Sequence, residues 1–187
     1  VVAQIGDEIT ITATPATGYR VSSITTNPSR TITNNKFTMP ASNVTVTVTC
    51  VKITYTITLS ADAGSLVTVT GQAQYGDQVS ISIEPANGYR IKSTTTSPNV
   101  TISNGKFTMP ASNLTITVTS EKVSYAVTKS ISPNGGGTLS LSKTSATMDE
   151  QITITATPAS GYRVKTITAT ANIYGGQNIT ITNNTFT

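Results

Sequence analysis

The stretch "TPATGYRV" at residues 14–21 returns as "EPANGYRI" at 84–91 and as "TPASGYRV" at 157–164. Proline presets φ near −65°, so we expect it at the second position of a type I turn. The glycine three residues later can take the left-handed conformation that lets a short loop rejoin the ladder. The tyrosine that follows is predicted to anchor the core. The three predicted corners consist of Pro15, Gly18 and Tyr19, of Pro85, Gly88 and Tyr89, and of Pro158, Gly161 and Tyr162.

The corner belongs to a longer repeat. Its tyrosines lie 70 and 73 residues apart (89 − 19 and 162 − 89), and "KFTMPASNVTVTV" at 36–48 returns as "KFTMPASNLTITV" at 106–118. Self-similarity at a fixed period indicates a tandem array. The predicted boundaries are 1–52 for repeat 1, 53–122 for repeat 2 and 123–187 for repeat 3. Because units this small gain stability by docking on their neighbours, neighbouring repeats of the same chain are the first expected partners.

The outer repeats do not match the whole pattern. Repeat 1 has no stretch that matches Tyr55–Ser60, and repeat 3 ends at "NNTFT", ahead of the "MPASN" segment. We therefore expect repeat 1 to lack its first strand and repeat 3 its last strand, as in a piece of a longer array. The alternative is complementation, in which an open sheet edge accepts a strand from another chain.

Composition and periodicity predict an all-β protein. Of the 187 residues, 39 are threonine, only 11% are charged and 36% are hydrophobic. Ile9, Ile11 and Ala13 alternate with threonines, which is typical of strands with one buried and one solvated face. Short strands between frequent turn residues favour tandem small β-sandwich-like modules of about 70 residues. No run of about 18 apolar residues is present, so no membrane span is expected.

Charge and cysteine usage exclude several classes of function. The net charge of +4 comes from scattered basic residues rather than a clustered stripe, which argues against nucleic-acid binding. The single cysteine, Cys50, shares a strand face with Val44, Val46 and Val48, so we expect it to be a small apolar residue of the core.

Candidate catalytic and metal sites are scarce. The chain has no histidine, which excludes Ser-His, Cys-His and His-based metal arrangements. Its carboxylates recur at equivalent turn positions rather than converging as a glycosidase pair would. We expect Asp7, Asp77 and Asp149 to cap turns. The chain is accordingly predicted to be non-catalytic and to use no cofactor and no metal.

The quoted segments resemble the divergent internalin-B-type B-repeats, also called Listeria–Bacteroides repeats, of bacterial surface proteins. The resemblance is carried by "SPNGGGTLS" at 132–140, "GDEITITATPATGYRV" at 6–21 and "FTMPASNVTVTV" at 37–48, and it covers nearly the whole chain. Where members often place a tryptophan five residues after the tyrosine, this chain has Ile24, Thr94 and Ile167. The resemblance implies an exported, extracellular or cell-surface protein whose repeats act as stalks or adhesion modules. It also implies an alternative fold of β-grasp-like repeats, which requires a short helix.

Three functional hypotheses follow. The first is a non-catalytic stalk, spacer or adhesion repeat of a bacterial surface or secreted protein. The second is a carbohydrate-binding module in which Tyr75 or Tyr174 stacks on a surface glycan, and the third is an accessory module of a larger secreted enzyme. A row of basic corner residues could also meet an anionic polysaccharide or a host or matrix protein. The residues of this row are Arg20, Arg90 and Arg163.

Overall fold

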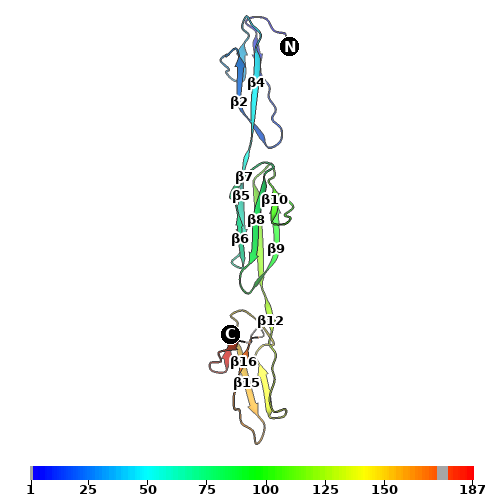
Figure 1. Cartoon of the computed structure of the whole chain (residues 1–187), viewed down its shortest axis with the longest axis vertical. Coiled ribbons are helices and arrows are strands. Elements are labelled where there is room, and N and C mark those ends of the chain that lie inside the picture. Colours follow the sequence, from blue (N-terminus) through cyan, green and yellow to red (C-terminus); the bar gives the residue numbers. More distant parts are fainter. Residues whose placement is uncertain (1, 172–176) are drawn as a thin grey trace. The chain divides into compact units, whose positions relative to one another are not determined.

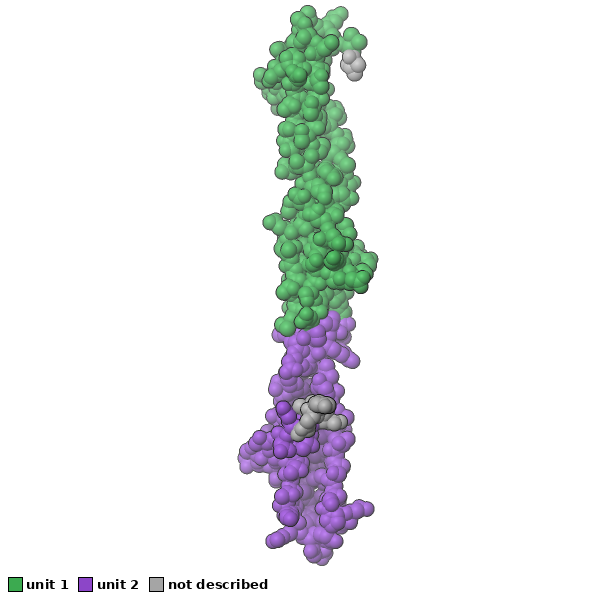
Figure 2. All heavy atoms as spheres, in the orientation of Figure 1, with its two compact units in different colours: residues 1–62, 66–84, 93–118 green, residues 63–65, 85–92, 119–187 purple. Residues whose placement is uncertain are grey.

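The computed structural model describes residues 2–171 and 177–187. The described residues form strands, turns and loops and include no helix, so the all-β prediction is confirmed. The β-grasp alternative would need a helix that these residues do not contain. Figure 1 shows the strands, and Figure 2 colours two compact units. The first unit contains Val1–Asp62, Leu66–Glu84 and Ser93–Val118, and the second contains Ala63–Ser65, Pro85–Lys92 and Thr119–Thr187.

Repeat 2 consists of two sheets with the strand orders β7-β5-β11-β9 and β10-β8-β6. The first sheet contains a parallel pair, since β5 and β11 align from Leu114↔Ile57 to Val118↔Ala61. The chain therefore enters repeat 2 through one strand of this pair and leaves it through the other. The bounds of the strands are β5 (Thr54–Ala61), β6 (Ser65–Val69), β7 (Gln72–Gln74), β8 (Gln78–Pro85), β9 (Tyr89–Ser97), β10 (Lys106–Thr108) and β11 (Leu114–Lys122).

Most of the buried apolar side chains belong to repeat 2. Leu114, Ile116 and Val118 of β11 are at most 1% exposed, and Met109 is fully buried. The threonine between the first two of these β11 residues is exposed, as expected from the alternation along a strand. The remaining core residues of repeat 2 are Ile57, Val79, Ile81 and Phe107.

Repeat 1 forms two antiparallel pairs, β1–β3 and β2–β4. Its strands are β1 (Glu8–Thr10), β2 (Tyr19–Asn27), β3 (Lys36–Thr38) and β4 (Thr45–Lys52). In the part of the chain that the structure describes, β4 pairs with β2 alone, whereas the matching β11 lies between β5 and β9. Val46 and Val48 are consequently 37% exposed. The prediction that Cys50 is a core residue is wrong, because Cys50 lies at the end of the same uncovered face and is exposed.

Repeat 3 contains a sheet of order β13-β15-β18 and the pairs β12–β14 and β16–β17. Its buried apolar residues are Ile152 and Ile154 of β15. The segment that follows the third corner is mostly without regular structure as far as Thr168. The strands are β12 (Ser124–Ala126), β13 (Gly137–Leu141), β14 (Ser145–Thr147), β15 (Ile152–Pro158), β16 (Ala169–Thr170), β17 (Asn178–Ile179) and β18 (Thr185–Phe186).

Candidate functional site

The repeated corner is a four-residue turn that places its glycine in the left-handed region. The φ angles of Gly18, Gly88 and Gly161 are 77°, 78° and 81°, which confirms the predicted conformation. The N–H of each corner tyrosine donates to the carbonyl of the alanine three residues earlier, at 3.0 Å in all three copies. Glycine is thus the third residue of the turn, as in type II. The prediction of a type I turn with proline at its second position is wrong, because each proline precedes the turn.

The corner tyrosines are not central core anchors. Tyr19 and Tyr162 are 37% and 51% exposed, and Tyr89 is half-buried. The ring of Tyr89 lies against Gly64, where a Cβ atom would overlap it. The glycine makes room for the ring, and its carbonyl accepts a hydrogen bond of 3.0 Å from Ala86 N–H. The tyrosine therefore fixes the corner to the turn between β5 and β6.

The first corner also joins repeat 1 to repeat 2. The Gly18 carbonyl accepts a hydrogen bond of 2.8 Å from the N–H of Ile53, the one residue between β4 and β5. The ring of Tyr75 covers Gly18, so that a Cβ at residue 18 would overlap it. Tyr75 also meets Tyr19 edge-on, with ring centroids 6.4 Å apart and an interplanar angle of 79°. These contacts, which we call the first joint, lie within one compact unit.

Lys52 adds an ion pair to the first joint. Its Nζ atom, at the end of β4, lies 3.1 Å from Asp77 Oδ1 in repeat 2. Both side chains are partly exposed, at 36% and 44%, so solvent screens much of their attraction. The aromatic contact and the backbone hydrogen bond therefore contribute most of the joint's specificity.

The second corner makes the same joint with repeat 3. The Gly88 carbonyl accepts a hydrogen bond of 2.8 Å from Val123 N–H, and Val123 is the one residue between β11 and β12. Met148 takes the place of Tyr75, and a Cβ at residue 88 would lie 3.0 Å from its side chain. A thioether thus replaces an aromatic ring over the glycine. Both joints have no spacer beyond a single residue.

The third corner has the same backbone but no covering side chain. No atom of the described residues lies within 4 Å of the position that a Cβ on Gly161 would take. Tyr162 instead approaches Gly136, where a Cβ would lie 3.5 Å from its ring. Comparison of the three corners therefore separates the turn itself, which is common to all, from the inter-repeat contact, which two of them make.

The comparison with protein families explains why the corner occurs three times in the chain. The model of the divergent InlB B-repeat domain matches residues 2–54, 55–124 and 125–187. The chain belongs to this family. The resemblance seen in the sequence is thereby confirmed, and the family consists of repeat domains of bacterial surface proteins. No curated protein matches the chain.

Each B-repeat also carries an acidic turn ahead of its β1, β8 or β15 strand. Asp7 Oδ2 accepts a hydrogen bond of 2.8 Å from Gln4 N–H, and Asp77 Oδ2 accepts one of 3.2 Å from Gln74 N–H. In B-repeat 3 the acceptor is Glu150, whose Oε2 lies 2.6 Å from Thr147 N. Turn capping is confirmed for Asp7 and Asp77. For Asp149 it is wrong, because this residue aligns with the glycine before each acid and itself takes a positive φ of 68°.

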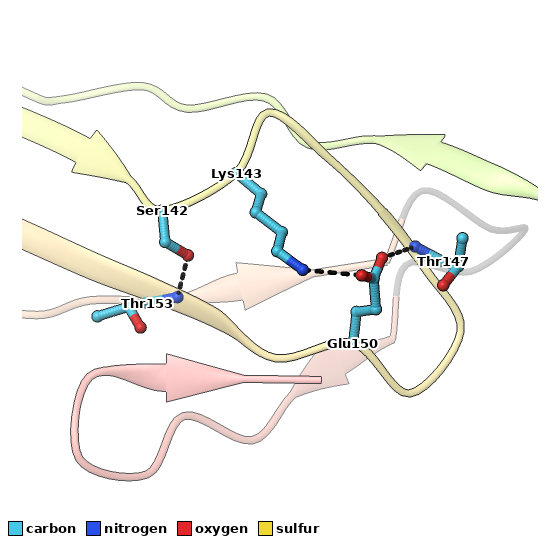
Figure 3. Close-up of polar contacts among 5 residues, drawn as sticks. All are labelled: Ser142, Lys143, Thr147, Glu150 and Thr153. Atoms are coloured by element: carbon cyan, nitrogen blue, oxygen red, sulfur yellow. Dashed lines mark hydrogen bonds and ion pairs between the residues drawn. The ribbon is translucent and has the colours of Figure 1, made fainter.

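Glu150 is held by charge as well as by the turn. Figure 3 shows its carboxylate between Lys143 and Thr147, with Lys143 Nζ at 2.8 Å. The hydrogen bond from Lys143 and then the one from Thr147 N–H lower the pKa of Glu150 from 4.5 to about 2. Beside it, Ser142 Oγ accepts a hydrogen bond of 2.9 Å from Thr153 N–H and ties the residue that follows β13 to β15. The cluster therefore fixes the turn and presents no open carboxylate pair.

The residues predicted as ligand contacts are found in different surroundings. Tyr75 is half-buried in the first joint, and Tyr174 lies outside the described residues. Arg20, Arg90 and Arg163 are all exposed, and Arg90 pairs with Glu121, with Nη2 2.6 Å from Oε1. The packing of Tyr75 on Gly18 in the first joint could not be recognised from the composition of the chain. A large apolar residue two positions before each turn acid, as at Tyr75 and Met148, is the signal that could have indicated it.

No group of three or more Cys, Asp or Glu side chains among residues 2–171 and 177–187 is arranged to hold a metal ion. Within the same residues, no helix has the length and apolar character needed to cross a membrane.

Proposed function

We propose that the chain is a non-catalytic, extracellular spacer of a bacterial surface or secreted protein, in which directly docked B-repeats hold another part of the protein away from the cell. The observation that carries the proposal is the joint. One residue separates the last strand of one repeat from the first strand of the next, and a glycine carbonyl of the corner binds that residue. A flexible linker would need several glycine or serine residues at this point.

Direct docking suits a spacer because it limits bending at each joint. Tyr75 and Met148 fill the space over the corner glycines, so bending would expose apolar surface and break a backbone hydrogen bond. The partners in this role are the neighbouring repeats.

The spacer role can be tested with spin labels at Ser23→Cys in β2 and Ser80→Cys in β8, in a Cys50→Ser background. We expect one narrow distance distribution for the docked joint. Insertion of Gly-Ser-Gly-Ser between Lys52 and Ile53 should broaden it, whereas the same insertion between Asn34 and Asn35, in the loop before β3, should not. Equally broad distributions with and without the joint insertion would contradict the proposal.

Export forms a separate part of the proposal. Protease treatment of intact cells of the source bacterium should remove epitopes of the B-repeats while a cytoplasmic marker stays intact. Protection of these epitopes until the cells are lysed would contradict the surface location without bearing on the stiffness of the joint.

A further inference from the structure

B-repeat 2 has its entering and leaving strands side by side and parallel. The entering strand β5 begins at Thr54, and the leaving strand β11 ends at Lys122. The register runs from Leu114↔Ile57 to Val118↔Ala61, so the start of β5 and the end of β11 lie at opposite ends of the pair. Tension on the chain therefore pulls the two strands in opposite directions along their own axes.

We propose that the β5–β11 pair is a mechanical clamp that makes B-repeat 2 resist unfolding when the chain is pulled from both ends. In a parallel pair the hydrogen bonds are evenly spaced along the strands. A pull along the strands loads all of these bonds at once, whereas a pull across one end would load them one after another. Simultaneous rupture needs a greater force because no single bond can break without the others.

Side-chain packing strengthens the clamp. Leu114, Ile116 and Val118 of β11 are almost completely buried, and Ile57 of β5 is 5% exposed. Sliding β11 past β5 must pull these side chains out of a close-packed core before the strands separate. The amide of Asn113 reinforces the start of the pair, since its Oδ1 accepts a hydrogen bond of 3.0 Å from Thr56 N–H.

The joints deliver force directly to this pair. Only Ile53 lies between β4 and β5, and only Val123 lies between β11 and β12. Little slack is therefore available to absorb a pull before the strands are loaded. The clamp goes beyond the spacer role, since a spacer could hold its position without resisting a strong pull, and the inference depends only on the strand arrangement of B-repeat 2.

Single-molecule pulling on the full chain tests the clamp through two attachment geometries that share one site. In a Cys50→Ser background, handles at Thr54→Cys and Lys122→Cys pull the strands past each other. Handles at Thr54→Cys and Ser112→Cys pull from the same end of the pair and peel it open. At equal loading rate we expect the rupture force to be at least about twofold higher in the first geometry, because the interstrand bonds then break together.

The length released on rupture identifies the repeat that unfolds. For Thr54 to Lys122, at about 3.4 Å per residue, the first geometry should release roughly 230 Å of contour length before the folded length is subtracted. Equal rupture forces in the two geometries would overturn the proposal.

Matched core variants provide a second test. Ile116→Val shortens a buried side chain in the loaded strand β11, and Ile81→Val makes the same change in β8, outside the clamp. Both should weaken the repeat in urea to a similar extent, but only Ile116→Val should lower the rupture force in the first geometry. Rupture forces lowered equally by the two variants would show that the force reports general stability and not the clamp.

Discussion

At the scale of single residues, the corner glycines have two separate roles. All three adopt a left-handed φ, which L-residues adopt only with strain. Gly18 and Gly88 also lie under a side chain of the next repeat, whereas in the described structure no atom lies within 4 Å of the position that a Cβ on Gly161 would take. The same substitution at the three sites therefore separates the conformational cost from the joint contact.

Alanine substitution should destabilise the chain in the order Gly18, Gly88, Gly161. Gly161→Ala carries only the backbone cost, about 1 kcal/mol. Gly88→Ala adds a close contact with the flexible Met148 side chain, and Gly18→Ala adds overlap with the Tyr75 ring, for a further cost of about 1–3 kcal/mol. Urea unfolding followed by circular dichroism measures the order. Equal losses of unfolding free energy at all three sites would contradict a role for the glycines in the joints.

Asp149 occupies a position for which glycine is better suited. Its φ is 68°, and the matching residues of the other repeats are Gly6 and Gly76, with φ of 88° and 79°. Asp149→Gly should therefore stabilise B-repeat 3 by about 1 kcal/mol, since strain at a left-handed residue is released. The converse change, Gly76→Asp, should destabilise B-repeat 2. A lower melting temperature for Asp149→Gly would show that the aspartate contributes something besides its backbone conformation.

Glu150 should make the stability of B-repeat 3 depend on acid pH. Its pKa in the folded chain is lowered to about 2, so its stabilising effect is complete above its ordinary pKa of 4.5 and is lost as the pH falls from there to about 2. Glu150→Gln should make the melting temperature less dependent on pH in this range, and Lys143→Met should have the same effect to a smaller extent. If the melting temperature of Glu150→Gln falls with acid pH as steeply as that of the wild type, the acid sensitivity belongs to other groups.

At the scale of elements, the joint depends on an aromatic contact between two repeats. Tyr19 precedes β4 in the chain and Tyr75 follows β7, yet their rings meet edge-on at 6.4 Å. A double-mutant cycle with Tyr19→Leu and Tyr75→Leu should give a coupling free energy of about 1 kcal/mol. Urea denaturation measures the four free energies of unfolding that the cycle requires, those of the wild type, the two single variants and the double variant. Additive effects would mean that the two rings stabilise their own repeats independently.

The sequence predicts single strands better than the contacts between them. Alternation correctly indicated that Val46 and Val48 share one face of a strand. It could not indicate whether another strand covers that face, and so it failed for Cys50. The left-handed glycines followed from local turn chemistry, whereas the packing of Tyr75 on Gly18 depends on residues 57 positions apart in the chain. The prediction for Asp149 is wrong because its neighbour Glu150 is also acidic, and Glu150 is the residue that aligns with Asp7 and Asp77.

At the scale of the whole molecule, the three B-repeats differ in how much apolar surface they bury. Ile116 and Val118 are at most 1% exposed in B-repeat 2, and the matching Val46 and Val48 of B-repeat 1 are 37% exposed. Hydrogen exchange should therefore be slower in peptides covering 114–120 than in those covering 44–50, by a factor of about ten or more. Equal exchange rates would mean that the whole chain opens as one cooperative unit.

The single residue between consecutive strands also constrains how such a chain can change in evolution. Side chains alternate between the two faces of a strand, so one residue added between Lys52 and Thr54 would turn the following strand over and present threonines where apolar groups are needed. Duplication or loss of an entire segment of about 70 residues leaves the alternation of apolar and threonine side chains between the two faces unchanged. Genes for such chains should therefore lengthen and shorten by complete modules, with insertions and deletions absent from the positions around residues 53 and 123.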